Sequence, residues 1–291
     1  MASIKLSKQQ VYFIGEGKVQ REALEGAVKD AISVANRGKR KHTLVYSPTG
    51  LGKSYVFKKI LDDNGIPYAV ISGKNSLFQI ALNLMVYYHL KPKGEIMIIL
   101  MDDCDMFFTK QDLMNVLKNM IEGEYKLTYN VQVNESQLTP IQKEAYKKCK
   151  SKYGKGIEVP CDEFVFMVTT NFMLPFDGQV DKLRKKEGTS SKVEKLESLA
   201  AFRSRFRTKD YPMDRNTKWG YLAYILLNTD IVDGIDDNQK TILIDWIWNN
   251  WDKMKETNLR TIEKMAEDME FNPETYRDRW ESDYLMFDFN I

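Results

Sequence analysis

The sequence predicts an α/β fold in which helices cover both faces of a parallel sheet, followed by a small α-helical domain at the C-terminus. Three observations lead to this prediction. Short apolar runs without alternation are separated by helical patterns, which is typical of a parallel sheet buried on both faces. A glycine-bearing turn connects the first of these runs to a helical pattern. From Thr217 onward the strand-like runs disappear, and the apolar residues follow helical spacing.

The composition is that of a folded, globular chain. Of the 291 residues, 43% are apolar and 29% are charged, and the net charge of +2 predicts no particular partner. Three cysteines without metal-ligand spacing and only two histidines argue against a zinc site and fit reduced thiols in the cytoplasm. Residues 1–10 lack the apolar core of a signal peptide, and the longest strongly apolar run, Ile96–Met101, is far too short for a membrane span. We therefore expect a cytoplasmic protein without a membrane segment.

Strands and helices alternate along the first two thirds of the chain. Residues 19–36 place apolar side chains at helical spacing, and this pattern ends at Asn36-Arg37-Gly38. Apolar runs of β character follow, and helical patterns such as Leu77–Leu90 separate them. The runs that we expect to form parallel strands are Thr43–Tyr46, Tyr68–Ser72, Ile96–Met101 and Phe164–Thr170.

The C-terminal third reads as helices alone. The expected helices are Trp219–Asn228, Lys240–Met254, Leu259–Met269 and Pro273–Met286. Asn272-Pro273 supplies an N-cap and a proline at the first helical position for the last of them. We expect an α/β domain over residues 1–212, with an insertion at about 124–162, and a helical domain with a C-terminal tail over residues 213–291.

The turn after the first strand has the layout of a phosphate-binding loop. It carries Gly50 and Gly52 and ends in Lys53-Ser54 at the head of a helical pattern. In such a turn, backbone N–H groups and the helix N-terminus wrap a polyphosphate, the lysine reaches the β- and γ-phosphates, and the serine holds a magnesium ion. The expected nucleotide-binding residues are Ser47, Pro48, Thr49, Gly50, Leu51, Gly52, Lys53, Ser54 and Tyr55. Ser47 departs from the G-x-x-x-x-G-K-[ST] pattern at its first glycine, and an ordinary glycine turn before a helix is the alternative.

Two further strands end in polar side chains that complement this loop. Asp102 and Asp103 follow the run at Ile96–Met101, and Asn171 follows Phe164–Thr170. Open α/β sheets bind ligands at the carboxyl ends of their strands. We expect Asp102 to orient the magnesium shell, Asp103 to orient and deprotonate an attacking water, and Asn171 to hydrogen-bond that water or the γ-phosphate. A polar helix cap and an ordinary turn residue are the alternatives.

The phosphate loop, the acidic strand end, the Thr-Asn strand end and the segment Ala200–Arg207 together resemble an AAA+ ATPase over roughly residues 11–269. This resemblance implies a P-loop αβα sandwich with a parallel five-stranded sheet and a helical lid. It also implies an enzyme that hydrolyses ATP with Mg²⁺. It implies that Asn171 is the sensor 1 residue, that Arg205 is an arginine finger for the neighbouring subunit's nucleotide, and that Arg260 is a second sensor on the lid.

Two features qualify this resemblance. The catalytic position, usually glutamate, is Asp103, whose carboxylate is one methylene short, so slow hydrolysis is expected unless the loop moves closer. The acidic pair, the Thr-Asn strand end and Leu117–Tyr125 also resemble superfamily 3 viral helicases, whose lids generally lack a residue like Arg260. Initiators, helicase loaders and these helicases, phage-encoded ones included, are therefore the nearest classes, and a phage protein would act in the cytoplasm of a bacterial host.

An arginine finger that acts in trans implies a homo-oligomer. A head-to-tail interface closes into a ring, such as a hexamer, or continues as a helix. A planar guanidinium suits the charge that develops during phosphoryl transfer. Arg203, Arg205 and Arg207 are too close in sequence to be told apart, and a helix cap or a surface ion pair is the alternative role for them.

The insertion carries six lysines and two tyrosines within thirteen residues. They are Lys143, Lys147, Lys148, Lys150, Lys152, Lys155, Tyr146 and Tyr153. Such residues grip a phosphate backbone and stack on the bases of single- or double-stranded DNA, but they equally suit a solvated helix and loop. A second basic segment, Lys182–Lys195, contains Gly188-Thr189-Ser190-Ser191, which is typical of a flexible loop. We expect a loop here rather than a second DNA contact, which is the alternative.

The C-terminal tail, Trp280–Ile291, alternates acidic and large apolar residues, so it docks either on a replication protein or on its own helical domain. The first function hypothesis is an oligomeric ATPase that acts on DNA or a DNA-replication complex, as a helicase, helicase loader or initiator-like motor. One alternative is a protein remodeller, although Ser72–Phe78 is a poor match to the pore loop of that class. The other is a nucleotide-gated structural ring with little turnover.

Overall fold

The strands form one parallel sheet in the structure, a computed structural model that describes residues 5–38, 41–73, 75–103, 105–122, 124–152 and 154–286. The strand order is β2-β3-β6-β1-β7, and all neighbouring strands run parallel. The strands are β1 (Thr43–Tyr46), β2 (Tyr68–Ser72), β3 (Met97–Asp102), β6 (Phe164–Thr170) and β7 (Arg207–Asp210). The predicted α/β class with a parallel five-stranded sheet is confirmed.

The chain divides into two units built from interleaved segments. The sheet unit comprises Gly26–Ser47 and Ser54–Tyr211. The helical unit comprises Met1–Glu25, Pro48–Lys53 and Pro212–Ile291. Both the first part of the long helix α1 (Lys8–Asn36) and the predicted phosphate loop therefore group with the C-terminal helices. This division changes unit between Tyr211 and Pro212, and it groups those two segments differently from a simple split into residues 1–212 and 213–291.

The carboxyl ends of the strands lie level at one edge of the sheet. Tyr46 of β1 is opposite both Thr170 of β6 and Asp210 of β7. Ser72 of β2 is opposite Asp102 of β3. β6 is fully buried and β3 nearly so, which explains their continuous apolar sequences. Residues that directly follow these strands are consequently gathered at the same edge.

β7 is the strand that the apolar pattern does not reveal. Its sequence is Arg-Thr-Lys-Asp, and none of these side chains is fully buried. It lies at the edge of the sheet and pairs only with β1. An edge strand is held by one ladder of backbone hydrogen bonds, so its side chains need not be apolar.

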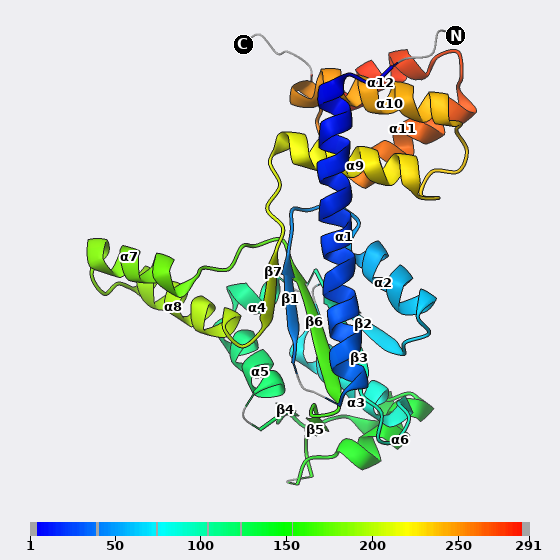
Figure 1. The fold of residues 1–291 in the computed structure, drawn as a ribbon. Coiled ribbons are helices and arrows are strands. Elements are labelled where there is room, and N and C mark those ends of the chain that lie inside the picture. The colour runs from blue at the N-terminus through cyan, green and yellow to red at the C-terminus, as the bar shows by residue number, and fades with distance from the viewer. Residues whose placement is uncertain are drawn as a thin grey trace. The chain divides into compact units, whose positions relative to one another are not determined.

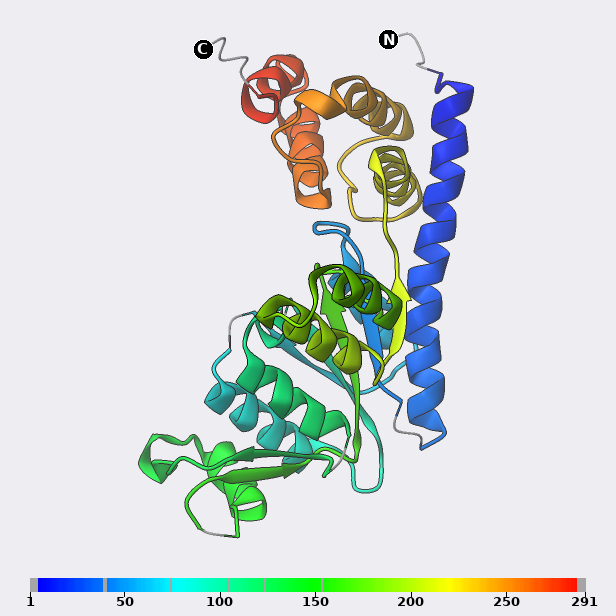
Figure 2. The same ribbon diagram turned by 90° about the vertical axis from the view of Figure 1, so that its left-hand side faces the viewer.

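Helices lie on both sides of the sheet (Figure 1). The part of α1 after Glu25 lies on one side, and α3 and α5 lie on the other (Figure 2). The long helix begins at Lys8, well before the expected start at residue 19. The remaining helices of the sheet unit outside the insertion are α2 (Lys53–Asp63, from Ser54 on), α3 (Leu77–Leu90), α4 (Met106–Thr109), α5 (Gln111–Ile121), α7 (Asp177–Glu187) and α8 (Ser191–Arg203).

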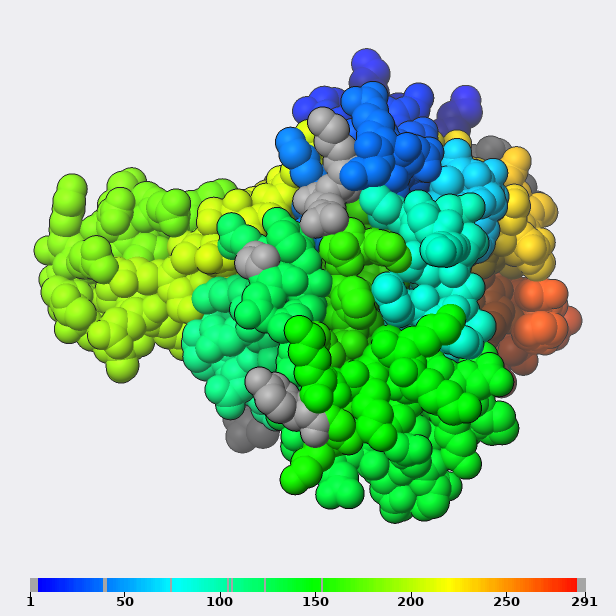
Figure 3. Space-filling view, turned by 90° about the horizontal axis from the view of Figure 1, so that it is seen from below, coloured from blue at the N-terminus to red at the C-terminus, as the bar shows by residue number. Residues whose placement is uncertain are grey.

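The predicted insertion at 124–162 is a small subdomain. Its strands β4 (Lys126–Tyr129) and β5 (Ile157–Pro160) form an antiparallel pair. Between them lie the 3₁₀ turn η1 (Glu135–Gln137) and helix α6 (Pro140–Cys149), which begins with a capping box. Side chains of α6 and β5 join the apolar core that α3 also contributes to. Figure 3 shows this subdomain and, to one side of the sheet unit, the projecting α7–α8 pair.

The helical unit is packed around aromatic residues. Its C-terminal elements are α9 (Arg215–Asn228), α10 (Asp237–Asn250), η2 (Trp251–Lys253), α11 (Leu259–Phe271) and α12 (Tyr276–Tyr284). Trp219 and Trp280 are fully buried, and their indole N–H groups donate to the carbonyls of Ile244 and Met265, each at 3.1 Å. The first part of α1 approaches α9 at two glycines, because a Cβ on Gly17 would lie 2.3 Å from Gly220.

Several expected helix boundaries are wrong. α9 begins at Arg215 rather than at Trp219, and the last helix ends at Tyr284 rather than at Met286. The helix expected over 240–254 spans Asp237–Asn250 and continues as the 3₁₀ turn. The last helix begins at Tyr276 rather than at Pro273, because Asn272 caps the end of α11, with its N–H donating to the Asp268 carbonyl at 2.9 Å. Among the described residues, no helix combines the length and the apolar character needed to cross a membrane.

Candidate functional site

The ends of β3 and β6 form a hydrogen-bonded cluster, which we term the strand-end group. It consists of Asp102, Asp103, Asp105, Thr169, Thr170 and Asn171. At its base, Asp102 is 7% exposed, and its Oδ1 accepts a hydrogen bond from the Thr169 hydroxyl at 2.8 Å. Thr169 thereby fixes one oxygen of the carboxylate that we expected to orient a magnesium shell.

Asn171 connects two carboxylates at the rim of the strand-end group. Its side-chain amide donates to Asp103 Oδ1 at 3.3 Å and to Asp105 Oδ2 at 3.2 Å. Asp105 Oδ1 in turn accepts from the Thr170 hydroxyl at 2.9 Å and from the Asn171 N–H at 3.3 Å. The structure therefore brings Asn171 and Asp103 together, as two residues that act on one water molecule require.

The backbone at Asp103 is unusual. Its φ of 51° lies in the left-handed region that non-glycine residues rarely adopt. Such a conformation persists only where surrounding contacts hold it, and it occurs preferentially at functional sites. The conformation follows directly after β3 and leaves the Asp103 side chain exposed while Asp102 is buried. Two adjacent carboxylates thus have different environments, one buried and one open to solvent.

Helix α2 presents a suitable N-terminus for an anion. It begins at Lys53, and its first turn contains no acidic residue. The positive end of the helix dipole therefore remains available for a phosphate group. Ser54 in this first turn is half-buried, and Tyr55 is exposed.

The expected magnesium ligands, Ser54 and Asp102, are both oxygen donors. Magnesium is commonly bound through one or two protein oxygens, with phosphate oxygens and water completing the octahedron. Over the described ranges, no group of three or more His, Cys, Asp or Glu side chains could hold a metal ion. The donor set therefore fits a magnesium ion that arrives with a nucleotide, rather than one held in a cage made only of protein groups.

The loop between β1 and α2 is held by hydrogen bonds within the helical unit. The Gly50 carbonyl accepts from the Leu259 N–H at 2.9 Å, and the Leu51 carbonyl accepts from the Tyr221 hydroxyl at 3.1 Å. The Lys53 ammonium, 6% exposed, donates to the Pro48 carbonyl at 3.0 Å. The loop conformation is consequently supported by the N-terminus of α11 and by α9.

Both glycines of the loop are required by geometry. Gly50 and Gly52 have φ values of 73° and 68°, in the left-handed region. A Cβ on Gly50 would also lie 2.3 Å from the Cβ of Asn258, and one on Gly52 would lie 2.7 Å from Leu259 Cδ1. Ser47, which replaces the first glycine of the pattern, instead extends β1, because its N–H donates to the Thr170 carbonyl at 3.4 Å. A serine is accommodated there because that position is still part of the ladder. Thr49 lies in the same turn and is exposed.

Arg260 stands at the start of α11, next to the residue that binds the loop. Asn258 caps this helix by accepting from the Thr261 N–H at 2.9 Å, and Leu259 donates to Gly50. Arg260 is exposed. Its role as a second sensor for the nucleotide remains a prediction.

The three closely spaced arginines have different environments. Arg203 is 8% exposed and bonds Asp210 through both terminal nitrogens. Arg205 is partly exposed and forms an ion pair with Glu122 at the end of α5. Arg207 is exposed on β7. Arg203 therefore uses its guanidinium for bonds within its own chain. The role of Arg205 as an arginine finger remains a prediction.

In the lysine-rich insertion, one of the residues that we expected to contact DNA is buried. Tyr146 is 3% exposed and belongs to the core, so it cannot stack on bases. Lys150 pairs with Glu135 at 3.1 Å and lies over the Tyr146 ring. The exposed lysines of the segment are Lys143, Lys147, Lys148, Lys150, Lys152 and Lys155, and Tyr153 lies outside the described residues.

The other two predicted partner segments are mostly ordered. Most of Lys182–Lys195 belongs to α7 and α8 rather than to a loop, and Gly188, Thr189 and Ser190 form the turn between these two helices. The tail packs on its own helical unit up to Met286, whose N–H donates to the Lys253 carbonyl at 2.7 Å. Residues 287–291 of the predicted docking tail lie outside the described residues.

Sequence reasoning missed several members of the site. Thr169, Thr170 and Asp105 bind the predicted side chains in the strand-end group, and Tyr221 supports the loop. The sequence contains a signal for the first three of these residues. Thr-Thr-Asn stands at the end of a buried apolar run, and a third aspartate follows the acidic pair. Nothing local distinguishes Tyr221 from other apolar residues of its helix.

Comparisons with known proteins return a distant structural match. Neither the protein-family models nor the curated proteins include a match to the chain. Among solved structures, the chain is similar to a proline-to-glycine mutant of RuvB from Thermotoga maritima, with 15% sequence identity and a TM-score of 0.43. The alignment covers 91% of this chain and 64% of that chain, so this chain spans less than two thirds of the RuvB structure. We base the fold assignment on the strand order and register of this chain's own sheet.

Proposed function

We propose that this protein is a magnesium-dependent AAA+ ATPase. The observation that carries the proposal is the strand-end group, in which the Asn171 amide bonds Asp103 at 3.3 Å while Thr169 fixes Asp102 at 2.8 Å. The loop that carries Gly50, Gly52 and Lys53 joins β1 of the same sheet to α2. A phosphate loop and an acidic strand end are the two parts that an ATPase of this kind needs.

Each residue of the proposed site has a distinct task. Lys53 and the N-terminus of α2 bind the phosphates, and Ser54 and Asp102 hold the magnesium ion. Asp103 accepts the proton of the attacking water, and Asn171 orients that water together with it. When bound, the magnesium ion neutralises the charge that develops on the phosphates.

Arg260 and Arg205 complete the proposal. Arg260, beside the loop contact at Leu259, binds the phosphates from the helical unit. Arg205 acts on the nucleotide of a neighbouring copy, so the active form is a homo-oligomer, closed as a ring or extended as a helix. Its ion pair with Glu122 holds it in the isolated chain and must open for this role.

We propose DNA, or a DNA-replication complex, as the substrate of this ATPase. The support is the exposed lysine face of the insertion, which includes Lys143 and Lys147 on α6. Lysines that follow a phosphate backbone give salt-dependent binding without base recognition. A helicase, a helicase loader and an initiator-like motor all fit this chemistry.

The first experiment tests nucleotide binding. Lys53→Ala is expected to abolish binding of a fluorescent ATP analogue, whereas Lys59→Ala, on the exposed side of the same helix, leaves the affinity unchanged. Unchanged affinity in the Lys53 variant would refute the site assignment.

The second experiment tests turnover in trans. Arg205→Ala is expected to retain ATP binding and lose hydrolysis, and mixing it with Asp103→Asn subunits should restore part of the rate. A site is then complete wherever an Asp103→Asn subunit supplies its intact Arg205 to the intact Asp103 of an Arg205→Ala subunit. Failure of the mixtures at every ratio would argue against a finger in trans.

The third experiment identifies the substrate. Single-stranded DNA is expected to raise the ATPase rate, and the gain should shrink as salt is increased. Stimulation by an unfolded polypeptide instead would show a protein remodeller, and ATP-dependent assembly without hydrolysis would show a structural ring.

A further inference from the structure

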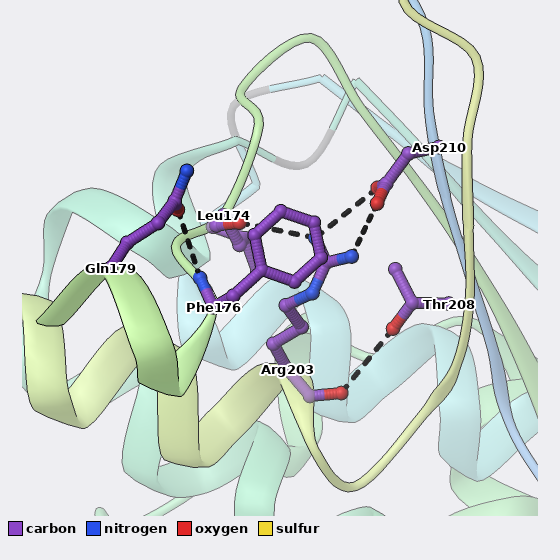
Figure 4. Close-up of polar contacts among 6 residues, drawn as sticks. All are labelled: Leu174, Phe176, Gln179, Arg203, Thr208 and Asp210. Carbon is purple, nitrogen blue, oxygen red and sulfur yellow. Dashed lines mark hydrogen bonds and ion pairs between the residues drawn. The ribbon is translucent and has the colours of Figure 1, made fainter. Parts of the chain in front are cut away.

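Arg203, at the end of α8, connects two segments at the carboxyl edge of the sheet. Its Nη1 donates to the Leu174 carbonyl at 3.0 Å and to Asp210 Oδ1 at 3.1 Å, and its Nη2 bonds Asp210 Oδ2 (Figure 4). The guanidinium centre lies 3.9 Å from the centroid of the Phe176 ring, which covers it. Both terminal nitrogens and one face of this planar group are thus occupied by the sheet unit itself.

The two bonded segments flank β1. Leu174 and Phe176 belong to the loop that starts directly after Asn171, at the end of β6. Asp210 ends β7 and is opposite Tyr46, the last residue of β1. The strands on either side of β1 are therefore tied together at their carboxyl ends through one side chain.

The backbone at Arg203 is fixed as well. The Thr208 hydroxyl donates to its carbonyl at 3.4 Å, as Figure 4 shows, and the Phe206 N–H donates to it at 3.1 Å. These bonds close the turn that carries Arg205. The position of Arg203 therefore influences both the loop behind Asn171 and the turn before β7.

A buried ion pair of this kind is weak evidence for a stabilising role. Removing two charges from water costs free energy that their attraction often only offsets, and apolar replacements of similar size are frequently as stable. A bidentate arginine–carboxylate pair, however, fixes geometry closely. We propose that Arg203 is a positioning residue, which acts through Asp210 and the Leu174 carbonyl to hold the loop after Asn171 and the turn carrying Arg205 in register with the end of β1. This inference rests on the proposed ATPase function.

The test replaces the ion pair by apolar residues of similar size. The double variant Arg203→Met/Asp210→Leu removes both charges together, so that neither is left buried without its partner. We expect kcat for ATP to fall at least about 10-fold, since small misplacements of catalytic groups have large effects on rate. The Kd for ATP should remain within about 2-fold, because these residues do not bind phosphate. Arg203→Lys retains the positive charge but lacks the planar guanidinium that bonds two acceptors at once. It serves as a second variant in case the double variant folds poorly.

A second measurement does not depend on activity. Amide hydrogen exchange should become faster over residues 172–176 in both variants, because the Leu174 carbonyl loses its hydrogen bond from the Arg203 guanidinium. Exchange in β3 should stay unchanged. Arg184→Met is the matched control, since Arg184 forms an exposed ion pair with Glu197 in the same helical pair. It should leave both kcat and the exchange pattern as in the wild type.

The outcomes are separable. A fall in kcat at constant Kd, together with faster exchange over 172–176, supports the positioning role. An unchanged kcat, or a fall that merely follows the loss of folded protein without a change in exchange, overturns it. Absence of hydrolysis in the wild-type oligomer overturns the proposed function, and this inference with it.

Discussion

His42 should make the stability of the sheet unit depend on pH. It lies just before β1 and is 3% exposed, with Phe166 and Phe206 as aromatic neighbours. Its Nδ1 accepts the Phe166 N–H at 3.1 Å, so the imidazole is neutral in the folded state. Burial lowers the pKa of His42 from 6.5 to about 4.

The sign and the size of the effect follow from this shift. The unfolded chain takes up a proton on His42 as the pH falls below 6.5, whereas the folded chain does so only near pH 4. The unfolded state therefore binds more protons in this window, and stability is lost as the pH falls from 6.5 to 4. The contribution is about 2 kcal/mol at pH 5 and reaches about 3 kcal/mol below pH 4, at 1.36 kcal/mol per pKa unit.

His42→Asn is the perturbation, because an amide oxygen can take the place of Nδ1 as an acceptor without titrating near neutral pH. Urea unfolding should be followed by far-UV circular dichroism, since all five tryptophans lie in the helical unit and report on that unit. We expect the wild type to lose about 2 kcal/mol more than the variant between pH 7.5 and pH 5. His89→Asn, at the other histidine, is the control. Parallel loss of stability in the wild type and His42→Asn would refute the reasoning.

Two further predictions concern the loop and the thiols. Gly50→Ala, in the helical unit, should lose about 1–3 kcal/mol more stability than Gly65→Ala, in the sheet unit, when urea unfolding is followed by far-UV circular dichroism, which reports on both units. Both glycines have positive φ but only Gly50 has a close neighbour, at Asn258; equal losses would show that the Asn258 contact is unimportant. Cys149 and Cys161 should react slowly with a thiol reagent at pH 8 in the folded protein and quickly in urea, because burial raises the pKa of both thiols, that of Cys149 to about 11. Peptide mass spectrometry measures each site, and rapid labelling of either in the folded state would contradict their burial.

The secondary structure was predictable where the apolar pattern of the sequence matches the burial of the side chains in the fold. The buried strand Phe164–Thr170 and the helix Leu77–Leu90 match their expected ranges, because continuous burial demands an apolar run and a clear end. β7 escaped detection because an edge strand is satisfied by backbone bonds and its Arg-Thr-Lys-Asp sequence has no apolar side chain. β5 escaped detection because it is only four residues long, although Ile157 and Val159 are buried. The start of α12 was misplaced because Asn272 caps the preceding helix instead of the following one.

For the candidate site, the strand ends that carry the polar side chains were predictable from the sequence, but the contacts between these side chains were not. Asp102, Asp103 and Asn171 each follow an apolar run, and the parallel register then brings them to one edge. The pairing of Asn171 with Asp103, and of Thr169 with Asp102, depends on side-chain directions that the sequence pattern does not contain. The contact between Gly50 and the start of α11 joins residues about 200 positions apart, and no local pattern encodes it.

The crossing of α1 and α9 at Gly17 and Gly220 has a consequence for biosynthesis. About 200 residues separate these two glycines, so the ribosome needs roughly 10–40 s to synthesise the second after the first. During that interval the first turns of α1, with Phe13 and its apolar neighbours, lack α9 and the helices that follow it, although most of the sheet unit is synthesised before α9. Nascent chains paused within this interval should accordingly recruit chaperones through the N-terminal segment, and release should follow the emergence of α9.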